Sequence, residues 1–416
     1  MLKDRNILLV VAARFVSRLG GTAAFFIGVW GTAAYTFEAT PTQFAWMAGG
    51  ASVAAIVGSL IAGALIDRFG PRRVLIAAEI LTIPAVIALM LADTFVAFAL
   101  FNACFALVGV PTFTAGASFA PYLVHERVQL EKVNALIEGV GSVAFILGPA
   151  VGAAVASVWE PRAVFVVMAV ASVAAIAFAY FIRIDETRRS SEGSSAWREL
   201  TEGLRVSYAT PSLRYYILTG TTIWFGFGAF AALEPLFYRD AVGVGVEWIG
   251  YMNTLFGVGL VAGAATLPRL PQRVVSARGL AIMTTFVGLG TVLYVGSTNL
   301  WLIAAGAIVW GFLIGATEPL LRTLIHLDSP HEYVGRIMGT AQYHRNAGEL
   351  IPLAVAPGLA AMFGVQSVLI GGGVLVALAA LAGFGVARRI DAEAIAHPEA
   401  PLFAAATEEP AVLPAG

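Results

Sequence analysis

The chain alternates long apolar runs with short polar segments that carry charged, proline or glycine residues. A run of about 20 apolar residues is long enough for an α-helix to cross the hydrocarbon core of a bilayer. The pattern predicts twelve membrane-spanning helices, in two sets of six separated by a polar stretch from Arg183 to Arg214. We therefore expect an all-α polytopic membrane protein. The predicted spans are residues 7–36, 44–66, 74–91, 95–120, 134–158, 163–182, 215–237, 248–267, 279–296, 300–325, 335–362 and 366–386.

The composition supports a membrane protein over a soluble one. Hydrophobic residues make up 59% of the 416 residues and charged residues only 12%, whereas soluble domains carry about 25% charged residues. The 44 glycines suit helices that pack closely in lipid. A formal net charge of −1 creates no field that would attract nucleic acid. Cys104 is the single cysteine, which excludes an internal disulfide and a Cys-based zinc site, so we expect neither a metal nor another cofactor.

Polar segments divide the chain into four parts. We predict an N-terminal six-helix half over 1–182, a cytoplasmic linker over 183–214, a C-terminal six-helix half over 215–386 and a disordered cytoplasmic tail over 387–416. In the linker, four apolar residues recur at helical spacing. They predict a short helix on the membrane surface, with a disordered linker as the alternative. These residues are Trp197, Leu200, Leu204 and Tyr208.

Basic residues predict the orientation in the membrane. With the N-terminus in the cytoplasm, most of the 25 Lys and Arg residues fall in cytoplasmic segments, and only Arg162 and Arg239 fall outside. Both termini are therefore expected on the cytoplasmic side of the cell membrane. The charges before the first apolar run resemble the start of a signal peptide, but Arg14 and Arg18 interrupt that run, so we expect a retained first helix.

An internal repeat supports two related halves. Shifting the chain by 200 residues aligns the second span and the loop after it with the eighth span and its loop. Two six-helix repeats around a central cavity are an architecture of secondary transporters, and we expect that arrangement here. The matched positions are Leu60, Ala62, Gly63, Ala64, Pro71 and Arg73 with Leu260, Ala262, Gly263, Ala264, Pro271 and Arg273.

A charged motif with two glycines follows the second span. It consists of Gly63, Asp67, Arg68, Gly70, Arg72 and Arg73. The motif resembles the loop motif of the major facilitator superfamily, with Pro71 in place of one basic residue. The resemblance implies a cytoplasmic gate, in which Gly63 lets another helix approach closely, Gly70 forms a tight turn, and Asp67 latches onto the other half. A solvated loop with the usual positive charge is the alternative, and Leu267 replaces the acid in the second half.

The fifth span contains Gly148, Pro149 and Gly152. These residues are similar to the Gly-Pro motif of antiporters in the same superfamily, although Ala144 and Ala153 stand where glycine is usual. Proline bends a helix by removing a backbone hydrogen bond, and glycines leave room for a neighbouring helix. The resemblance implies antiport, with a bend that limits leak where the halves meet. A generic kinked membrane helix is the alternative.

Ionisable residues within the spans are candidates for proton coupling, because charge at membrane depth is costly. Glu349, near the middle of the eleventh span, is the favoured proton-exchanging carboxylate, and a spacing of four places Arg345 on the same helical face. Glu318 and Arg322 have the same spacing in the tenth span, where a structural ion pair is favoured over a carrier role. The fourth span lacks the arginine of many proton-coupled drug exporters, so coupling would use other groups or another ion.

Four further charged residues lie nearer the cytoplasmic ends of their spans. Glu79 and Glu138 rank lower as coupling candidates and are expected to pair with cytoplasmic arginines. Arg14 and Arg18 share one face of the first span and are expected to snorkel to the cytoplasmic surface. An anion site that faces the cavity is the alternative for this arginine pair.

Aromatic and amide side chains within the spans are candidates for the wall of a substrate cavity. The alternative for each of them is the ordinary role of such residues in packing or lipid contact. The candidates are Phe25, Trp30, Asn102, Asn253, Gln342 and Tyr343.

Together these features predict a monomeric secondary transporter that exports an amphipathic small molecule, such as a drug, antibiotic or secondary metabolite. Exchange for protons by alternating access is the expected mechanism. An uptake permease of the same fold for a sugar, metabolite or siderophore is the alternative. A membrane enzyme or sensor is less favoured, because the sequence shows no catalytic triad pattern and no phosphate-binding loop. The expected partners are the substrate, the proton and the lipid bilayer.

Overall fold

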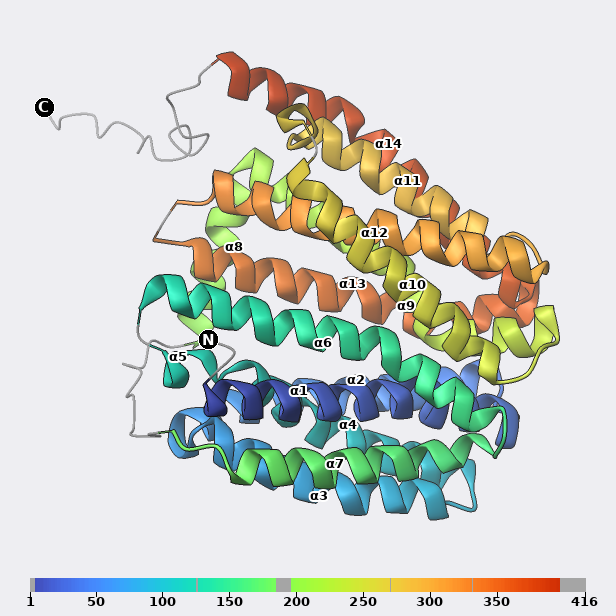
Figure 1. Cartoon of the computed structure of the whole chain (residues 1–416). Helices are drawn as coiled ribbons and strands as arrows, with labels where there is room; N and C mark the ends of the chain where they lie inside the picture. Colours follow the sequence, from blue (N-terminus) through green and yellow to red (C-terminus); the bar gives the residue numbers. More distant parts are fainter. Residues whose placement is uncertain (1–3, 125, 185–195, 270, 331, 397–416) are drawn as a thin grey trace, which may run out of the picture. The chain divides into compact units, whose positions relative to one another are not determined.

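The computed structural model describes residues 4–124, 126–184, 196–269, 271–330 and 332–396, and these residues contain helices and no β-strand (Figure 1). Twelve of the described segments are long and apolar enough to cross a membrane. Each predicted span overlaps one of them, so the predicted all-α membrane fold is confirmed. The segments are Arg5–Thr36, Pro41–Phe69, Pro71–Leu91, Phe95–Ala117, Val128–Ala156, Pro161–Tyr180, Pro211–Val242, Glu247–Arg269, Ala277–Val295, Leu300–Asp328, Val334–Phe363 and Val365–Ala394.

Most of these segments are single α-helices, but some include short π- or 3₁₀-helical turns. The first span comprises α1 (Arg5–Ala23) and the π-helical η1 (Ala24–Val29) and η2 (Thr32–Thr36). The remaining elements are α2 (Pro41–Phe69), α3 (Pro71–Leu91), α4 (Phe95–Ala117), α5 (Ala120–Leu123), α6 (Arg127–Ala156), η3 (Pro161–Ala163), α7 (Val164–Tyr180), α8 (Ala196–Ala209), α9 (Pro211–Leu236), η4 (Phe237–Val242), α10 (Glu247–Thr266), η5 (Leu267–Arg269), η6 (Gln272–Val274), α11 (Ala277–Val295), α12 (Leu300–Asp328), α13 (Val334–Phe363) and α14 (Val365–Ala396).

Local sequence signals explain where several helices begin. At α2, the backbone N–H of Gln43 donates to Thr40 Oγ1 at 3.3 Å and the N–H of Thr40 donates to Gln43 Oε1 at 2.8 Å, which forms a capping box. Pro41 occupies the first helical position, where no backbone N–H is needed. Asn299 caps α12 by accepting a hydrogen bond from the N–H of Trp301 at 2.9 Å. These caps satisfy donors that the helix itself leaves unpaired.

The first of two compact units comprises Met1–Glu192, Ala232–Gly257 and Pro357–Val365. Within it, α1 packs against α6 and α7, α2 packs against α4, and α3 packs against α4 and α7. Figure 1 shows α1, α6 and α7 running side by side. A buried apolar cluster near the start of α1 joins the ends of these helices. The cluster includes Ile7, Val10, Ile66, Leu75, Phe119, Val133 and Ile182.

The second unit comprises Gly193–Ala231, Val258–Ala356 and Gln366–Gly416. Here α11 packs along α12, and a buried cluster joins α9, α11, α12, α13 and α14. The predicted division into halves at 182 and 215 stays a prediction, since the contacts assign Ala232–Gly257 and Pro357–Val365 to the first unit. The cluster of the second unit includes Leu213, Tyr216, Leu280, Leu320, Leu324, Ile337 and Ile390.

The last helix continues beyond the predicted end of the final span at residue 386 and reaches Ala396. Asp391 explains this extension. Its carboxylate accepts hydrogen bonds from the N–H groups of Ala277 at 2.8 Å and Arg278 at 3.1 Å, and it pairs with Arg278 Nε at 2.6 Å. A carboxylate at the N-terminus of α11 is favourable because it meets free N–H groups and the positive helix end. Residues 397–416 of the predicted tail lie outside the described residues.

The predicted linker contains the helix α8, which lies against α13. Arg336 of α13 forms an ion pair with Glu202 at 2.6 Å, and the Tyr208 hydroxyl lies 2.7 Å from His344 Nε2. A Cβ on Gly203 would approach the Arg336 carbonyl oxygen to 2.6 Å, so glycine permits this close packing. The prediction of a helix in the linker is therefore confirmed for residues 196–209. Residues 185–195 of the linker, and the side chains of Trp197 and Leu200, lie outside the described part of the chain.

Candidate functional site

The turn between α2 and α3 contains the glycines of the motif after the second span. Gly70 has φ of 83° and ends α2 where α3 begins, a backbone conformation that favours glycine. Gly63 was expected to let another helix approach closely, and the structure does not show this role. A Cβ on Gly63 would meet no described atom within 4 Å, so no helix among the described residues approaches it closely.

The charged residues of the motif lie on the surface or at the end of α7. Arg72 donates from Nε to the carbonyl oxygen of Ala179 at 3.0 Å and from Nη2 to that of Tyr180 at 2.8 Å. It thereby places a positive charge on carbonyl oxygens at the C-terminal end of α7, where the helix dipole favours a cation. Asp67 is exposed and makes no hydrogen bond or ion pair with a described residue, so its latch role stays a prediction. Arg68 and Arg73 are also exposed.

We expect Gly70→Ala to lower the free energy of unfolding by about 1–3 kcal/mol, because a backbone with φ of 83° and ψ of 158° is strained for any residue other than glycine. Thermal unfolding of the purified protein in detergent measures the effect. Gly63→Ala is the matched control, since the added methyl group has open space around it. Equal unfolding midpoints for the two variants would contradict the role given to Gly70.

The glycines of the fifth span bring α6 close to α1. A Cβ on Gly148 would overlap Thr22 Oγ1 and approach the Leu19 carbonyl oxygen to 2.7 Å. One on Gly152 would approach Ile27 Cγ1 to 2.8 Å. Only glycine therefore fits at these two positions without moving one of the helices.

The same stretch of α6 also contacts α10, within the first unit. A Cβ on Gly250 would overlap the Pro149 carbonyl oxygen, and one on Gly257 would lie 2.9 Å from Ile146 Cγ1. The Thr254 hydroxyl donates to the carbonyl oxygen of Ile146 at 3.2 Å, which supplies a partner where proline disturbs the backbone hydrogen bonds of α6. The sequence analysis did not identify these α10 residues. Gly250, Thr254 and Gly257 are separated by four and three residues, which places these small residues on one face of the helix. This spacing was the sequence signal that could have identified them.

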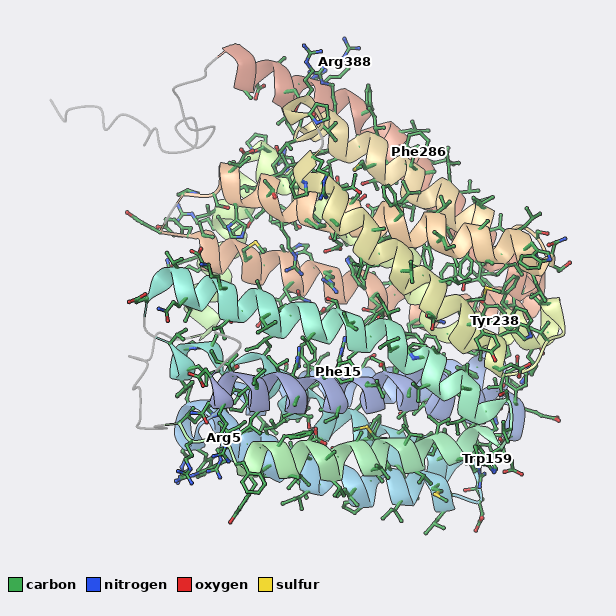
Figure 2. All side chains as sticks on the ribbon, in the orientation of Figure 1. Arg5, Phe15, Trp159, Tyr238, Phe286 and Arg388 are labelled. Carbon is green, nitrogen blue, oxygen red and sulfur yellow. The ribbon has the colours of Figure 1, made fainter. Side chains whose placement is uncertain are left out.

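The first and seventh spans both end in π-helix on the same side of the first unit. Figure 2 shows Arg5 at one end of this unit and Trp159 and Tyr238 at the opposite end. At that opposite end, η2 follows α1 and η4 follows α9. π-helical turns are rare and occur frequently at functional sites.

Hydrogen bonds join these two π-helical ends. Arg239 Nη1 donates to the carbonyl oxygens of Ala34 at 2.7 Å and Ala39 at 3.1 Å. The Tyr35 hydroxyl donates to the carbonyl oxygen of Val244 at 3.0 Å. We call these contacts the Arg239 clasp. Sequence patterns gave no signal for it, because the acceptors are backbone carbonyls.

A cavity of about 330 Å³ lies within the first unit, with walls from α1, α3, α4, α6 and α7. Arg14 and Arg18 of α1 face it. Arg14 is only 4% exposed and donates from Nη1 to the carbonyl oxygen of Phe113 at 2.9 Å. The expected snorkelling of Arg14 is therefore wrong, because a carbonyl on α4 binds the guanidinium within the unit. The aromatic part of the wall consists of Phe25, Phe26, Phe105, Phe113 and Phe145.

Two carboxylates lie near this cavity in different environments. Glu138 is 64% exposed, and its Oε1 is 3.8 Å from Arg14 Nη2. Glu79 of α3 is 0% exposed, and neither of its oxygens accepts a hydrogen bond from a described residue. Ser17, which lines the cavity, and Ser172 are the polar side chains that face Glu79. The expected pairing of Glu79 with a cytoplasmic arginine is therefore wrong, because burial removes it from the charged loops.

A second cavity, of about 260 Å³, lies within the second unit and contains a charged cluster. Glu318 accepts a hydrogen bond from Trp224 Nε1 at 2.7 Å and pairs with Arg322 at 3.9 Å and Arg345 at 3.8 Å. The Arg345 guanidinium stacks 3.6 Å from the Trp224 ring centroid. Arg345 thus pairs with Glu318 of α12, and no ion pair joins it to Glu349 among the described residues.

The predicted cavity residues are dispersed in the structure. Phe25 lines the cavity of the first unit and Gln342 lines that of the second. Trp30 is buried and packs on the rings of Phe25 and Phe26. The remaining three lie outside both walls. Asn102 is buried on α4, Tyr343 is exposed, and Asn253 is buried and hydrogen-bonded to the carbonyl oxygen of Ile249.

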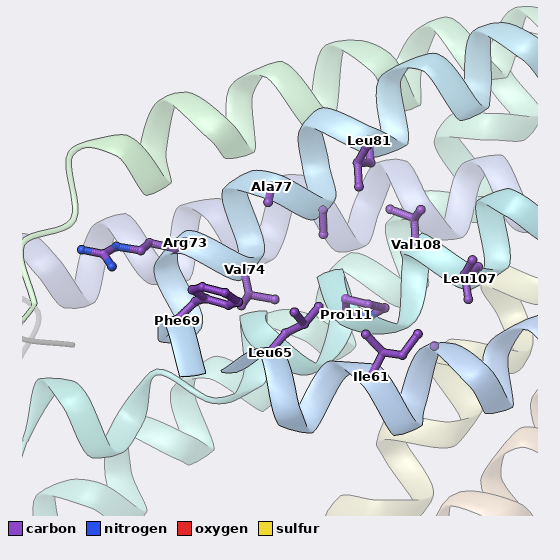
Figure 3. Close-up of a pocket in the computed structure, with 12 residues that line it drawn as sticks. Ile61, Leu65, Phe69, Arg73, Val74, Ala77, Leu81, Leu107, Val108 and Pro111 are labelled. Carbon is purple, nitrogen blue, oxygen red and sulfur yellow. The ribbon is translucent and has the colours of Figure 1, made fainter. Parts of the chain in front are cut away.

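Another cavity of the first unit, about 490 Å³, lies between α2, α3 and α4 (Figure 3). Its labelled wall is aliphatic and aromatic, and Arg73 is its one ionisable side chain. Figure 3 shows the Arg73 guanidinium pointing away from the other lining side chains. This groove therefore lacks the polar groups that orient a substrate, and the Arg14 and Arg18 cavity is the better candidate site.

Comparison with known proteins identifies the family to which the chain belongs. A family model described as Major Facilitator Superfamily matches residues 10–351. Macrolide efflux protein A of Enterococcus faecalis is 25% identical over 219 residues, which cover 51% of this chain and 68% of that protein. The chain spans 54% of the protein of the same name from Streptococcus pyogenes. Multidrug efflux pump Tap of Mycolicibacterium fortuitum is 25% identical over 388 residues, which cover 87% of this chain and 92% of the pump.

A solved structure agrees with the family match. The crystal structure of nucleoside transporter NupG superposes with a TM-score of 0.71 at 12% identity, covering 92% of this chain and 99% of that one. At this identity the similarity shows the fold alone. Because the family model extends over most of the 416 residues, the protein belongs to the major facilitator superfamily of membrane transporters.

Proposed function

We propose that the protein exports amphipathic small molecules across the cell membrane in exchange for protons, as a monomer with both termini in the cytoplasm. The observation that carries the proposal is the Arg14 and Arg18 cavity, which combines five phenylalanines with two arginines. An apolar wall with a few polar groups suits a substrate that has both an apolar part and a polar part. Relatives named as macrolide and multidrug efflux proteins support export as the direction.

Alternating access needs contacts that form in one state and break in the other. The Arg239 clasp has this character, because it joins two spans through hydrogen bonds that would break if the spans moved apart. With the termini in the cytoplasm, the clasp lies at the outer end, so its opening would release substrate outside. Asp67 and Gly70 would act at the inner end. The buried Glu79, which lies beside the cavity residue Ser17, is our first candidate for the proton-binding carboxylate, and Glu349 is the second.

Growth of a bacterium that lacks its major efflux pumps tests the proposed function. We expect the wild-type protein to protect cells against some members of a panel of amphipathic antibiotics and dyes. A protonophore should abolish the protection, and Asp67→Asn should lose it at matched membrane levels. If the wild type instead accumulates a radiolabelled sugar, metabolite or siderophore and protects against no compound, the protein is an uptake permease and the proposal is wrong.

A further inference from the structure

We propose that the cavity of the first unit binds the acidic group of an organic anion, with Arg18 as the anion-binding residue and Arg14 beside it. This inference rests on the proposed function and narrows its substrate class. The substrate would be an amphipathic acid, in which a carboxylate, sulfonate or phosphate is attached to an apolar body.

Arg14 is held in place by its surroundings. Its side chain fits between Gly116 of α4 and Gly141 of α6, where an added Cβ would lie 3.2 Å and 3.5 Å from guanidinium nitrogens. Nη1 is bound by the carbonyl oxygen of Phe113, but the buried Nε has no hydrogen-bond partner among the described residues. A buried N–H without a partner is costly, so the protein itself does not fully satisfy the Arg14 guanidinium.

Arg18 lies one helical turn further along α1 and has even fewer polar contacts. Its guanidinium lies 4.8 Å from the ring centroid of Phe113 and 5.5 Å from that of Phe145. No carboxylate of the described residues forms an ion pair with it. These cation–π contacts orient the guanidinium but leave its five N–H donors available.

The two positive charges of Arg14 and Arg18 are only weakly paired within the protein. Glu138 is exposed and 3.8 Å from Arg14, and the buried Glu79 forms no ion pair with a described residue. A positive charge inside an apolar cavity is expensive unless an anion accompanies it. The acidic group of a substrate would supply that anion and gain charge-assisted hydrogen bonds.

The rest of the wall suits the apolar body of such a substrate. Three of its four hydroxyl groups, those of Thr22, Thr82 and Thr112, donate to backbone carbonyls of their own helices. The guanidinium groups are therefore the main donors that face the cavity. The phenylalanines and Met168 provide the apolar surface, and a volume of about 330 Å³ holds a small aromatic molecule.

Binding of two dyes with the same fluorophore tests the proposal. Dansylglycine carries a carboxylate and dansylamide is neutral, and both would be titrated against the full-length protein in phosphatidylcholine nanodiscs. We expect the wild type to bind the acid about tenfold or more tightly than the amide. Arg18→Gln should reduce acid binding to about the level of the amide, with a much larger loss of affinity for the acid than for the amide, and Arg18→Lys should retain part of the preference.

Arg183→Gln is the matched control, because it removes one exposed arginine outside the cavity and should not change either affinity. Thermal unfolding of each variant checks that the fold is intact. Nanodiscs that contain phosphatidylglycerol reveal whether an anionic lipid competes for the site, and a loss of dansylglycine binding there would assign the anion to the lipid headgroup.

Three results would overturn the proposal: equal wild-type affinities for the two dyes, no binding of the acid up to its solubility limit, or an equal loss of both dyes in Arg18→Gln. None of them bears on export itself. Protection of cells against neutral or cationic drugs would leave the proposed export standing while the anion site failed.

Discussion

Gly148→Ala is expected to abolish export and to lower the thermal unfolding midpoint of the protein. The added methyl group would overlap Thr22 Oγ1 and lie 2.7 Å from the carbonyl oxygen of Leu19. A threonine side chain can rotate, but the carbonyl belongs to the backbone of α1, so α1 and α6 must separate. Overpacking of this kind costs about 1–3 kcal/mol. Export suffers in addition, because the same face of α1 presents Arg18 and Thr22 to the candidate site.

Gly139→Ala is the control for this prediction. It makes the same change on the same helix, but its Cβ would meet no atom within 4 Å. Both variants would be compared with the wild type by thermal unfolding and by dye efflux from proteoliposomes. If the two variants retained equal activity and stability, the close approach of α6 to α1 would have no functional role.

Glu79→Gln is expected to uncouple transport from the proton gradient while leaving exchange of substrate for substrate. The amide has nearly the shape of the carboxylate but does not titrate. Because Glu79 is completely buried without a hydrogen-bond partner among the described residues, its charge state would decide whether the surrounding helices can rearrange around it. Proteoliposomes with and without an imposed pH gradient measure both activities in one preparation.

Glu349→Gln provides the comparison, since Glu349 is the carboxylate that the sequence favours. We expect this variant to keep its response to the gradient, because Glu349 is only partly buried. The opposite pattern, with coupling lost in Glu349→Gln and kept in Glu79→Gln, would make Glu349 the proton carrier and our choice wrong.

The membrane spans were predictable because every helix that crosses the bilayer must be apolar over the thickness of the hydrocarbon core. Apolar runs of sufficient length satisfy this condition, so each of the twelve spans was located from hydropathy alone. The turn at Gly70 was also predictable, because the glycine lies between two such runs and adopts a backbone conformation that glycine favours.

Side-chain partners were harder to predict, because they depend on which helices become neighbours. The spacing of Arg345 and Glu349 suggested a pair, yet Glu318 of another helix is the partner of Arg345. Arg14 lies near a span end and was expected at the surface, but the carbonyl oxygen that binds it belongs to Phe113, 99 residues away. Local spacing identifies residues that share a face and does not reveal what that face meets.

The docking of α8 on α13 has a consequence for biosynthesis. The ribosome produces α8 before α9, whereas the residues that hold α8, Arg336 and His344, belong to the eleventh span. During translation five further spans, the seventh to the eleventh, must therefore be made before α8 can dock. Its docking can only follow insertion of the eleventh span, which makes it a late event in the maturation of the nascent chain.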